Sequence, residues 1–138
     1  MHYNQTGAAV RTLLITLVAI AAFLVIAFTL LPKGFNHDTS IIGKGSNVVV
    51  LAHDKNTVYS LNLMGMLNQV RDDYAGRVEF LVVDSGSGDG RLFILKERAN
   101  PGDLLLYGQD GVRREVLINI NDETILRAAL DDVFSLRK

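Results

Sequence analysis

The fold is decided by one stretch of the sequence, Asn47-Val-Val-Val-Leu-Ala52 followed by a helical segment and then by Arg77-Val-Glu-Phe-Leu-Val-Val83. Both apolar runs are rich in β-branched residues and do not alternate with polar ones, which is typical of strands covered on both faces. The segment from Thr57 to Tyr74 between them predicts a helix, because apolar residues recur there at helical spacing. These residues are Leu61, Met64, Leu67, Val70 and Tyr74. The order implies two parallel strands joined by a right-handed helical crossover.

The rest of the domain is expected to complete a β-α-β-α-β-β-α order. A short helix is predicted over residues 91–98, ahead of Pro101. The strands predicted at 104–107 and 113–120 flank a Gly-Gln-Asp-Gly turn and form a hairpin. Asn121 or Asp122 is expected to cap a last amphipathic helix. The sequence therefore predicts a single α/β domain over residues 47–138, which is large enough to hold its own core.

The segment before this domain has the features of a membrane anchor. Residues 12–31 contain no charged side chain, and twenty helical residues match the roughly 30 Å thickness of a bilayer core. We therefore predict an N-terminal tail over 1–11, one transmembrane helix over 12–32 that contacts the lipid bilayer through residues 12–31, and a Gly- and Ser-rich linker over 33–46. The charged side chains of Arg11 and Lys33 flank the helix, and Pro32 is expected to end it.

A cleaved signal peptide is the main alternative for this segment. Signal peptides have a shorter apolar core and a small-residue cleavage site, which the sequence Phe28-Thr-Leu-Leu-Pro-Lys33 does not provide. The first ten residues contain no acid, and Arg11 precedes the helix. This pattern favours a cytoplasmic N-terminus. We therefore expect a single-pass protein of a bacterial inner membrane, with a periplasmic domain.

The composition excludes several functions. The chain has 14 basic and 15 acidic residues and a net charge of -1, so it offers no electrostatic surface for nucleic acid. It has no cysteine, and therefore no disulfide, thiolate metal site or thiol chemistry. His53 and Asp54 are too few to hold a metal, which usually takes three or four ligands. No metal and no cofactor are predicted.

The segment Asp84-Ser-Gly-Ser-Gly-Asp-Gly90 is rich in small and acidic residues. It lacks the ligand spacing of an EF-hand and the Gly-Lys-Ser/Thr of a phosphate-binding loop. We expect a flexible connection between a strand and a helix.

Several of these segments together resemble thioredoxin. The resemblance covers residues 47–134 and includes the first strand, the helix end Leu67-Asn-Gln-Val-Arg-Asp-Asp-Tyr-Ala-Gly76, the second strand, Pro101, Asp103-Leu-Leu-Leu-Tyr107 and Asp110-Gly111. It implies a thioredoxin-like fold for the domain.

The residues that carry thioredoxin chemistry are replaced in this chain. The resemblance places the Trp-Cys-Gly-Pro-Cys segment of thioredoxins on residues 56–60, so that Thr57 and Ser60 stand at the cysteine positions and Leu51 at the buried acid. Disulfide exchange needs a thiolate nucleophile, which a hydroxyl cannot replace. We expect a redox-inactive protein that is not an enzyme, with Thr57 as a helix N-cap.

The family also has a cis-proline loop beside its active site, where an extended peptide can pair. Pro101, preceded by Asn100, is the candidate, although a one-residue shift in register would place Gly102 there. Either this loop keeps a peptide-binding edge, or Pro101 is an ordinary turn residue. Tyr59, beside Val58, either forms an exposed contact patch or packs under the loop. The predicted partner-binding residues are Thr57, Val58, Tyr59, Ser60, Asn100, Pro101 and Gly102.

These features predict a membrane-anchored interaction module. It would be an accessory subunit or assembly factor whose partner is a larger membrane protein complex, with electron-transport and photosynthetic complexes among the candidates. The alternative is a cysteine-free enzyme or a binder of a thiol compound such as glutathione beside Pro101, using the Thr57 or Ser60 hydroxyl as a donor. Glutathione-transferase-like relatives carry an additional helical domain for which this chain has no length.

Overall fold

A computed structural model describes residues 5–31 and 33–136 of the chain. The chain divides into two compact units, Met1–Gly34 and Phe35–Lys138. Pro32, the predicted end of the membrane helix, lies outside the described residues.

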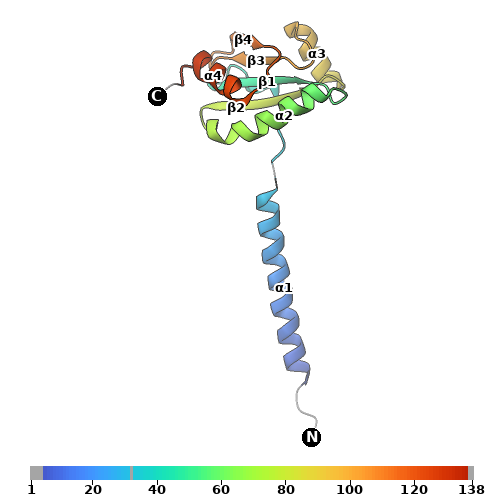
Figure 1. Cartoon of the computed structure of the whole chain (residues 1–138). Helices are drawn as coiled ribbons and strands as arrows, with labels where there is room; N and C mark the ends of the chain where they lie inside the picture. Colours follow the sequence, from blue (N-terminus) through green and yellow to red (C-terminus); the bar gives the residue numbers. More distant parts are fainter. Residues whose placement is uncertain (1–4, 32, 137–138) are drawn as a thin grey trace. The chain divides into compact units, whose positions relative to one another are not determined.

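The N-terminal unit is the helix α1, Gln5–Leu30 (Figure 1). Its stretch Gly7–Leu30 is long and apolar enough to cross a membrane. The helix begins at Gln5, so the predicted tail over 1–11 is helical from that residue onward. A single arginine does not end the helix, because its long side chain can carry the charge away from it. Thr12 and Thr16 donate their hydroxyls to the carbonyl oxygens of Ala8 and Thr12, at 2.9 Å each. Both hydroxyls therefore have the internal partner that an apolar surrounding requires.

Four strands form one sheet within the described part of the second unit (Figure 1). They are β1 (Asn47–His53), β2 (Val78–Asp84), β3 (Leu104–Tyr107) and β4 (Arg113–Leu117), in the spatial order β2-β1-β3-β4. The pair β1 and β2 is parallel, whereas β3 is antiparallel to both β1 and β4. With the helices α2 (Val58–Val70), α3 (Gly88–Glu97) and α4 (Glu123–Val133), the predicted β-α-β-α-β-β-α order is confirmed.

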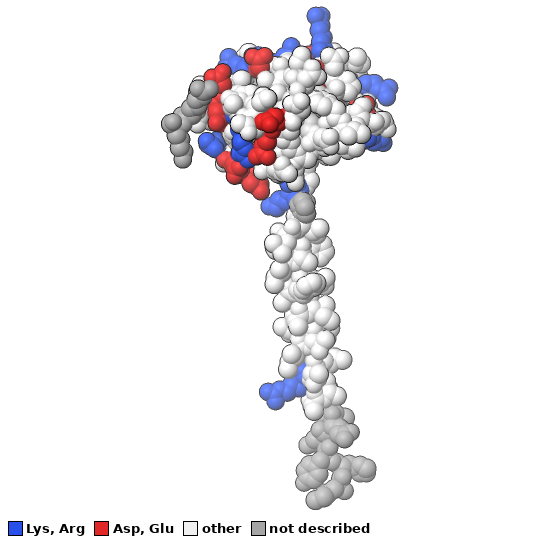
Figure 2. All heavy atoms as spheres, in the orientation of Figure 1, with Lys and Arg blue, Asp and Glu red and all other residues white. Residues whose placement is uncertain are grey.

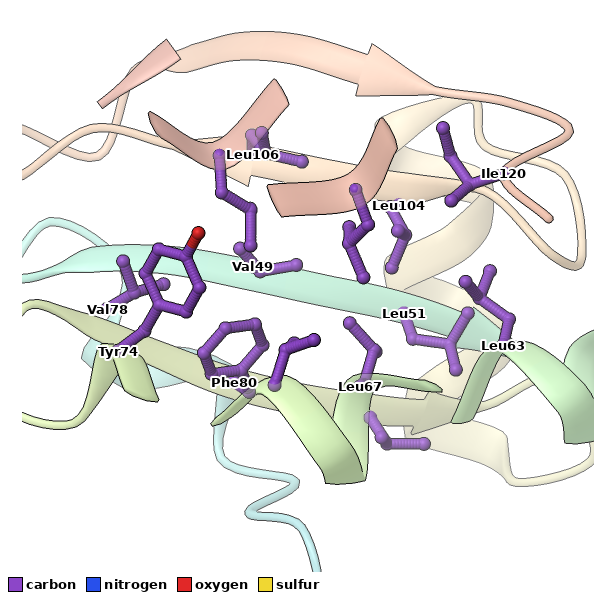
Figure 3. Close-up of a cluster of buried hydrophobic side chains, with 14 residues drawn as sticks. Val49, Leu51, Leu63, Leu67, Tyr74, Val78, Phe80, Leu104, Leu106 and Ile120 are labelled. Carbon is purple, nitrogen blue, oxygen red and sulfur yellow. The ribbon is translucent and has the colours of Figure 1, made fainter. Parts of the chain in front are cut away.

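The sheet has a hydrophobic core on each face, which explains the unbroken apolar runs. Helices α2 and α4 cover one face, where Val49 and Leu51 of β1 meet Leu67 of α2 (Figure 3). Leu126 of α4 belongs to the same core. Helix α3 covers the other face, where the alternate residues of β1 meet Ile94. Every residue of β1 after Asn47 is buried, because its two sets of side chains enter two cores.

Helix α2 buries a face slightly different from the predicted one. Leu61 is 45% exposed, and the buried stripe consists of Ser60, Leu63, Leu67 and Val70. The helix ends at Val70, and the short 3₁₀ helix η2 (Arg71–Tyr74) follows it. A polar residue, Ser60, starts the buried stripe, which is why apolar periodicity alone assigned Leu61 to it.

Helix α3 begins three residues earlier than predicted, inside the segment expected to be a flexible connection. The Ser87 hydroxyl accepts a hydrogen bond from the Gly90 amide at 3.0 Å and caps the helix. Gly90 is buried so closely against the end of β2 that an added Cβ would overlap the Asp84 carbonyl oxygen. Two of the glycines thus belong to the helix start, and Gly90 allows close packing.

The predicted linker over 33–46 is part of the domain from Phe35 onward. Phe35 packs against the core under α2, with the Arg71 guanidinium 4.6 Å from its ring centre. The Asn36 carbonyl accepts from the Val82 amide at 3.0 Å, which places a single β-bridge beside β2. A 3₁₀ helix η1 (Thr39–Ile41) precedes β1. These contacts are made by single residues without a period, so the sequence pattern did not reveal them.

Candidate functional site

The predicted site residues meet at one end of the sheet. Strands β1 and β2 end there, β3 begins there, and α2 starts directly after β1. The loop before β3 is fixed to the end of β1, because Gly102 donates its amide to the Ala52 carbonyl at 2.7 Å and Ala52 donates to the Asp103 carbonyl at 3.0 Å. The structure therefore brings residues 57–60 and 100–102 to the same place.

Ser60 is built into the interior of this end. It is fully buried, and its Oγ lies 2.8 Å from Nδ1 of the buried His53. The same oxygen accepts from the Asp54 amide at 3.0 Å. Which of the two groups donates in the bond between Ser60 and His53 depends on the tautomer of the imidazole. The prediction that Ser60 contacts a partner is wrong, because its hydroxyl instead connects the end of β1 to α2.

Thr57 caps helix α2, which confirms its predicted role. Its hydroxyl oxygen accepts from the Ser60 amide at 3.4 Å and donates to the Asp54 carbonyl at 3.2 Å. The Asp54 carboxylate in turn accepts from the Asn56 amide at 2.9 Å. The polar groups of the loop between β1 and α2 therefore bond mainly to one another, and the hydroxyls of Thr57 and Ser60 hold this loop to the helix start.

Tyr59 packs under the neighbouring loop, against Gly102. A Cβ added to Gly102 would lie 2.7 Å from Cε1 of Tyr59, and this residue has φ +95°, which side-chain-bearing residues rarely adopt. The Tyr59 hydroxyl is buried without a well-formed hydrogen bond among the described residues, and burial raises its pKa. Tyr59 thus supports the loop and does not form the exposed aromatic patch that was one of the two predicted alternatives.

The loop before β3 is held by a buried carboxylate. Asp103 accepts from the Asn100 amide at 2.8 Å and from its side-chain amide at 3.4 Å. The peptide bond before Pro101 is not cis, and the proline itself is exposed. Gly102, which is buried, faces Tyr59. Of the two predicted registers, the structure therefore places Gly102 opposite the start of α2.

Large apolar side chains remain exposed around these fixed loops. Val58 is 72% exposed at the first turn of α2, Leu61 is 45% exposed one turn further, and Ile118 is 61% exposed directly after β4. Leu117 pairs with Leu104, so Ile118 lies at the same end of the sheet as the loop that contains Pro101. We call Val58, Leu61, Pro101 and Ile118 the Val58 surface.

Sequence reasoning identified Val58 and Pro101 but missed Leu61 and Ile118. Leu61 could have been found from the sequence, because it lies three residues after Val58 on the same helix. Ile118 lacked such a signal, because alternation alone did not show that β4 ends one residue before it.

Comparison with known proteins establishes the class of this domain. The sequence matches no protein-family profile, and no curated protein is a significant match to it. Among solved structures, it is similar to the crystal structure of thioredoxin O2 from Arabidopsis thaliana in the oxidized state, with a TM-score of 0.58 and 16% identity, covering 69% of this chain and 84% of that one. It is also similar to the solution structure of an uncharacterized thioredoxin-like protein from Clostridium perfringens, with a TM-score of 0.61 and 11% identity, covering 70% and 78%. The domain has a thioredoxin-like fold.

In this chain, the end of the sheet where α2 begins lacks the cysteines of thioredoxins. The chain has no cysteine, so it cannot carry out thiol–disulfide exchange. The hydroxyls of Thr57 and Ser60, which the resemblance assigns to the cysteine positions, serve as a helix cap and as a buried link to His53. This end of the sheet therefore consists of two hydrogen-bonded loops with exposed apolar side chains beside them.

Proposed function

We propose that this protein is a redox-inactive, membrane-anchored interaction module of the thioredoxin-like fold. It serves as an accessory subunit or assembly factor of a larger membrane protein complex, a class that includes electron-transport and photosynthetic complexes. The single observation that carries the proposal is the exposure of Val58, which is 72% exposed on loops whose polar groups are bonded within the domain.

The rigidity of this surface favours binding. Side chains that are ordered before association lose less conformational entropy when a partner binds. Hydrogen bonds of Thr57 and Ser60 hold the start of α2, and the Asp103 carboxylate holds the loop that carries Pro101. Large exposed apolar side chains that gather at one end of a domain are a common feature of partner contacts. A partner would cover the Val58 surface with little rearrangement of either loop.

The anchor and its orientation are the second part of the proposal. The large apolar side chains of α1 are exposed, as expected of a helix in contact with lipid. Arg11 lies near the start of α1 and Lys33 follows its end, and no acid precedes Arg11. By the positive-inside rule this favours a cytoplasmic N-terminus. The domain then lies in the periplasm of a bacterium, tethered to the inner membrane.

The proposal is tested by gentle detergent extraction of the tagged full-length chain from its native membrane, with size determination and mass spectrometry of the proteins that accompany it. The test variant is Val58→Asp, which an N-terminal helix position tolerates well. The matched control is Val112→Asp, because Val112 is also exposed but lies in the turn between β3 and β4. We expect a stoichiometric set of membrane proteins with wild type and with the control, and its loss with Val58→Asp.

Two results would contradict the proposal. Extraction of the wild-type chain as a lone species would remove the subunit role, and equal recovery of partners with both variants would remove the Val58 surface. Glutathione provides the discriminating follow-up, since a ligand at 100 times its dissociation constant stabilises a protein by about 2.7 kcal/mol. A lone species whose melting temperature rises with glutathione would favour the thiol-compound binder instead.

A further inference from the structure

Helix α3 presents two leucines to solvent. Its buried side consists of Gly90 and Ile94, which pack on the sheet. On the opposite side, Leu92 is 67% exposed and Leu95 is 66% exposed. Residues three apart on a helix are neighbours, so the two leucines form one apolar strip along the outer face of α3.

Basic residues flank this strip. At 3.6 residues per turn, Arg91 and Lys96 fall on either side of the two leucines, and Arg98 follows at the end of the helix. All three are exposed, and none is paired with a carboxylate in the part of the chain that the structure describes. Figure 2 shows Lys and Arg side chains projecting where Figure 1 places α3.

Asp89 is the one exposed carboxylate of α3, so it offsets only part of the charge of the three basic side chains. Asp89 lies in the first turn of the helix, where a carboxylate is stabilised by the backbone amides. Glu97 turns toward β4, where its carboxylate lies 3.5 Å from the Arg113 guanidinium. The outer face of α3 therefore combines an apolar centre with a net positive border.

We propose that this face docks on an anionic lipid bilayer, with Leu92 and Leu95 entering the interface and Arg91, Lys96 and Arg98 contacting lipid phosphates. A strip of apolar residues bordered by Lys and Arg is the pattern of helices that lie in a membrane interface. Charge complementarity thus selects lipid phosphate as the partner of this face.

The short tether makes a weak contact of this kind sufficient. This step rests on the membrane-anchoring role proposed above for α1. Helix α1 ends at Leu30 and the domain begins at Phe35, so four residues join them. Both units belong to one chain, so docking would be an intramolecular step with a high effective concentration of lipid.

Docking through α3 would leave the proposed partner surface accessible. Helix α3 covers one face of the sheet, whereas α2 and α4 cover the other. The Val58 surface starts on α2.

The test uses a fluorophore on a single introduced thiol, because the natural chain has no cysteine. Leu95→Cys places an environment-sensitive label on α3, and Asn68→Cys places the same label on the exposed side of α2 as the matched control. The full-length chain is reconstituted into vesicles of phosphatidylcholine with phosphatidylglycerol, or of phosphatidylcholine alone. Lipids with a nitroxide head group quench the label when it lies at the bilayer surface.

We expect strong quenching at position 95 and little at position 68 in the anionic vesicles. Quenching at 95 should fall in neutral vesicles, at high salt, and in the Arg91→Gln/Lys96→Gln background. The docked-to-undocked ratio should decrease about fivefold per basic residue removed, which corresponds to about 1 kcal/mol for each Lys or Arg near an anionic surface. Equal quenching at both positions, or quenching at 95 that ignores lipid charge, would overturn the proposal.

The same variants separate this proposal from the proposed function. If docking fails in vesicles while partners are still lost with Val58→Asp, only the lipid contact is wrong. If Arg91→Gln/Lys96→Gln releases the partners and vesicles show no docking, then α3 binds a protein, which also overturns the lipid proposal.

Discussion

The two ends of the sheet meet their surroundings in different ways. Toward the end where β1 begins, charged groups pair with each other: Arg114 with Asp110 at 2.7 Å, and Arg127 with Asp73 at 2.8 Å. Acidic and basic side chains gather there on the side where α4 runs to the C-terminus (Figure 2). At the other end, the Ser60 hydroxyl and the Asp103 carboxylate are bonded in the interior, and Val58 and Ile118 are exposed beside polar residues such as Lys55 and Asn56. This difference is the basis for the partner surface that we propose at the second end.

The largest expected loss of stability is at Gly102, which holds the loop before β3 at the end of the sheet where β1 ends. Gly102→Ala places a methyl group against the Tyr59 ring and strains a residue with φ +95°. Backbone strain and steric overlap together should lower the free energy of unfolding by about 3 kcal/mol. Urea denaturation of the full-length chain in detergent, followed by circular dichroism, measures this loss.

Gly65→Ala is the matched control for that substitution. Gly65 is exposed within α2, and an added Cβ would contact nothing within 4 Å. The change should therefore stabilise the helix by about 0.5–1 kcal/mol. Similar effects of the two substitutions would show that Gly102 is not constrained by Tyr59.

Ser60→Ala should have the next largest effect. It removes the partner of the Asp54 amide and of His53 Nδ1, both at the buried end of β1. Unsatisfied buried groups should lower the free energy of unfolding by about 2 kcal/mol. Partner recovery per folded molecule should stay unchanged, since Ser60 has no exposed surface. Loss of partners without loss of stability would place Ser60 in the interface after all.

At the end where β1 begins, the ionisation of Tyr74 makes a smaller, pH-dependent contribution to the free energy of unfolding. Burial, together with the hydrogen bond from the hydroxyl to Asp131 at 2.8 Å, raises the pKa of Tyr74 to about 12 from 10.0. The native state holds this proton more tightly than the unfolded chain. The protonated Tyr74 hydroxyl therefore stabilises the native state fully below about pH 10, and this stabilisation is lost as the pH rises toward about 12.

Tyr74→Phe isolates that contribution. It should cost about 1 kcal/mol at neutral pH, where the hydrogen bond is lost, and should flatten the fall in stability at alkaline pH. Urea denaturation across the alkaline range measures both. An unchanged alkaline slope would assign the titration to another group.

The smallest effect is expected for Tyr59→Phe. The hydroxyl is buried without a well-formed hydrogen bond, so its removal relieves a desolvation cost while the ring stays against Gly102. The free energy of unfolding should stay equal or rise by up to about 1 kcal/mol. A marked loss of stability would reveal a partner for the hydroxyl and a different role for Tyr59.

Much of the fold could be predicted because burial leaves a pattern in the sequence. Strand β1 enters two cores, so its apolar run is unbroken, and the Gly at 76 closes the segment after α2 with φ +77°. The start of α3 could not be predicted in the same way, since Ser87 and Gly90 function there through a cap and a close approach to Asp84. Glycine-rich composition predicts a loop unless the packing partner is known.

The place of the candidate residues in the fold could be predicted, but not which of their side chains face solvent. The count back from the end of α2 placed Thr57 and Ser60 correctly at the helix start. Whether a side chain at the helix start faces solvent depends on its position within the first turn of α2 and on how the loop before β3 covers that turn. Ser60 and Tyr59 turn inward, and Val58 between Thr57 and Tyr59 turns outward. The link from Ser60 to His53 joins residues seven apart across a loop and leaves no periodic signal.

Site-specific photocrosslinking in native membranes decides whether the Val58 surface contacts a partner. A photoreactive amino acid is introduced at Val58 or, as the control at the opposite end of the sheet, at Val112, both exposed in the isolated chain. The proposed contact predicts a discrete adduct with one membrane protein from position 58 and none from position 112. Adducts of equal yield at both positions, or no adduct at position 58, would contradict it.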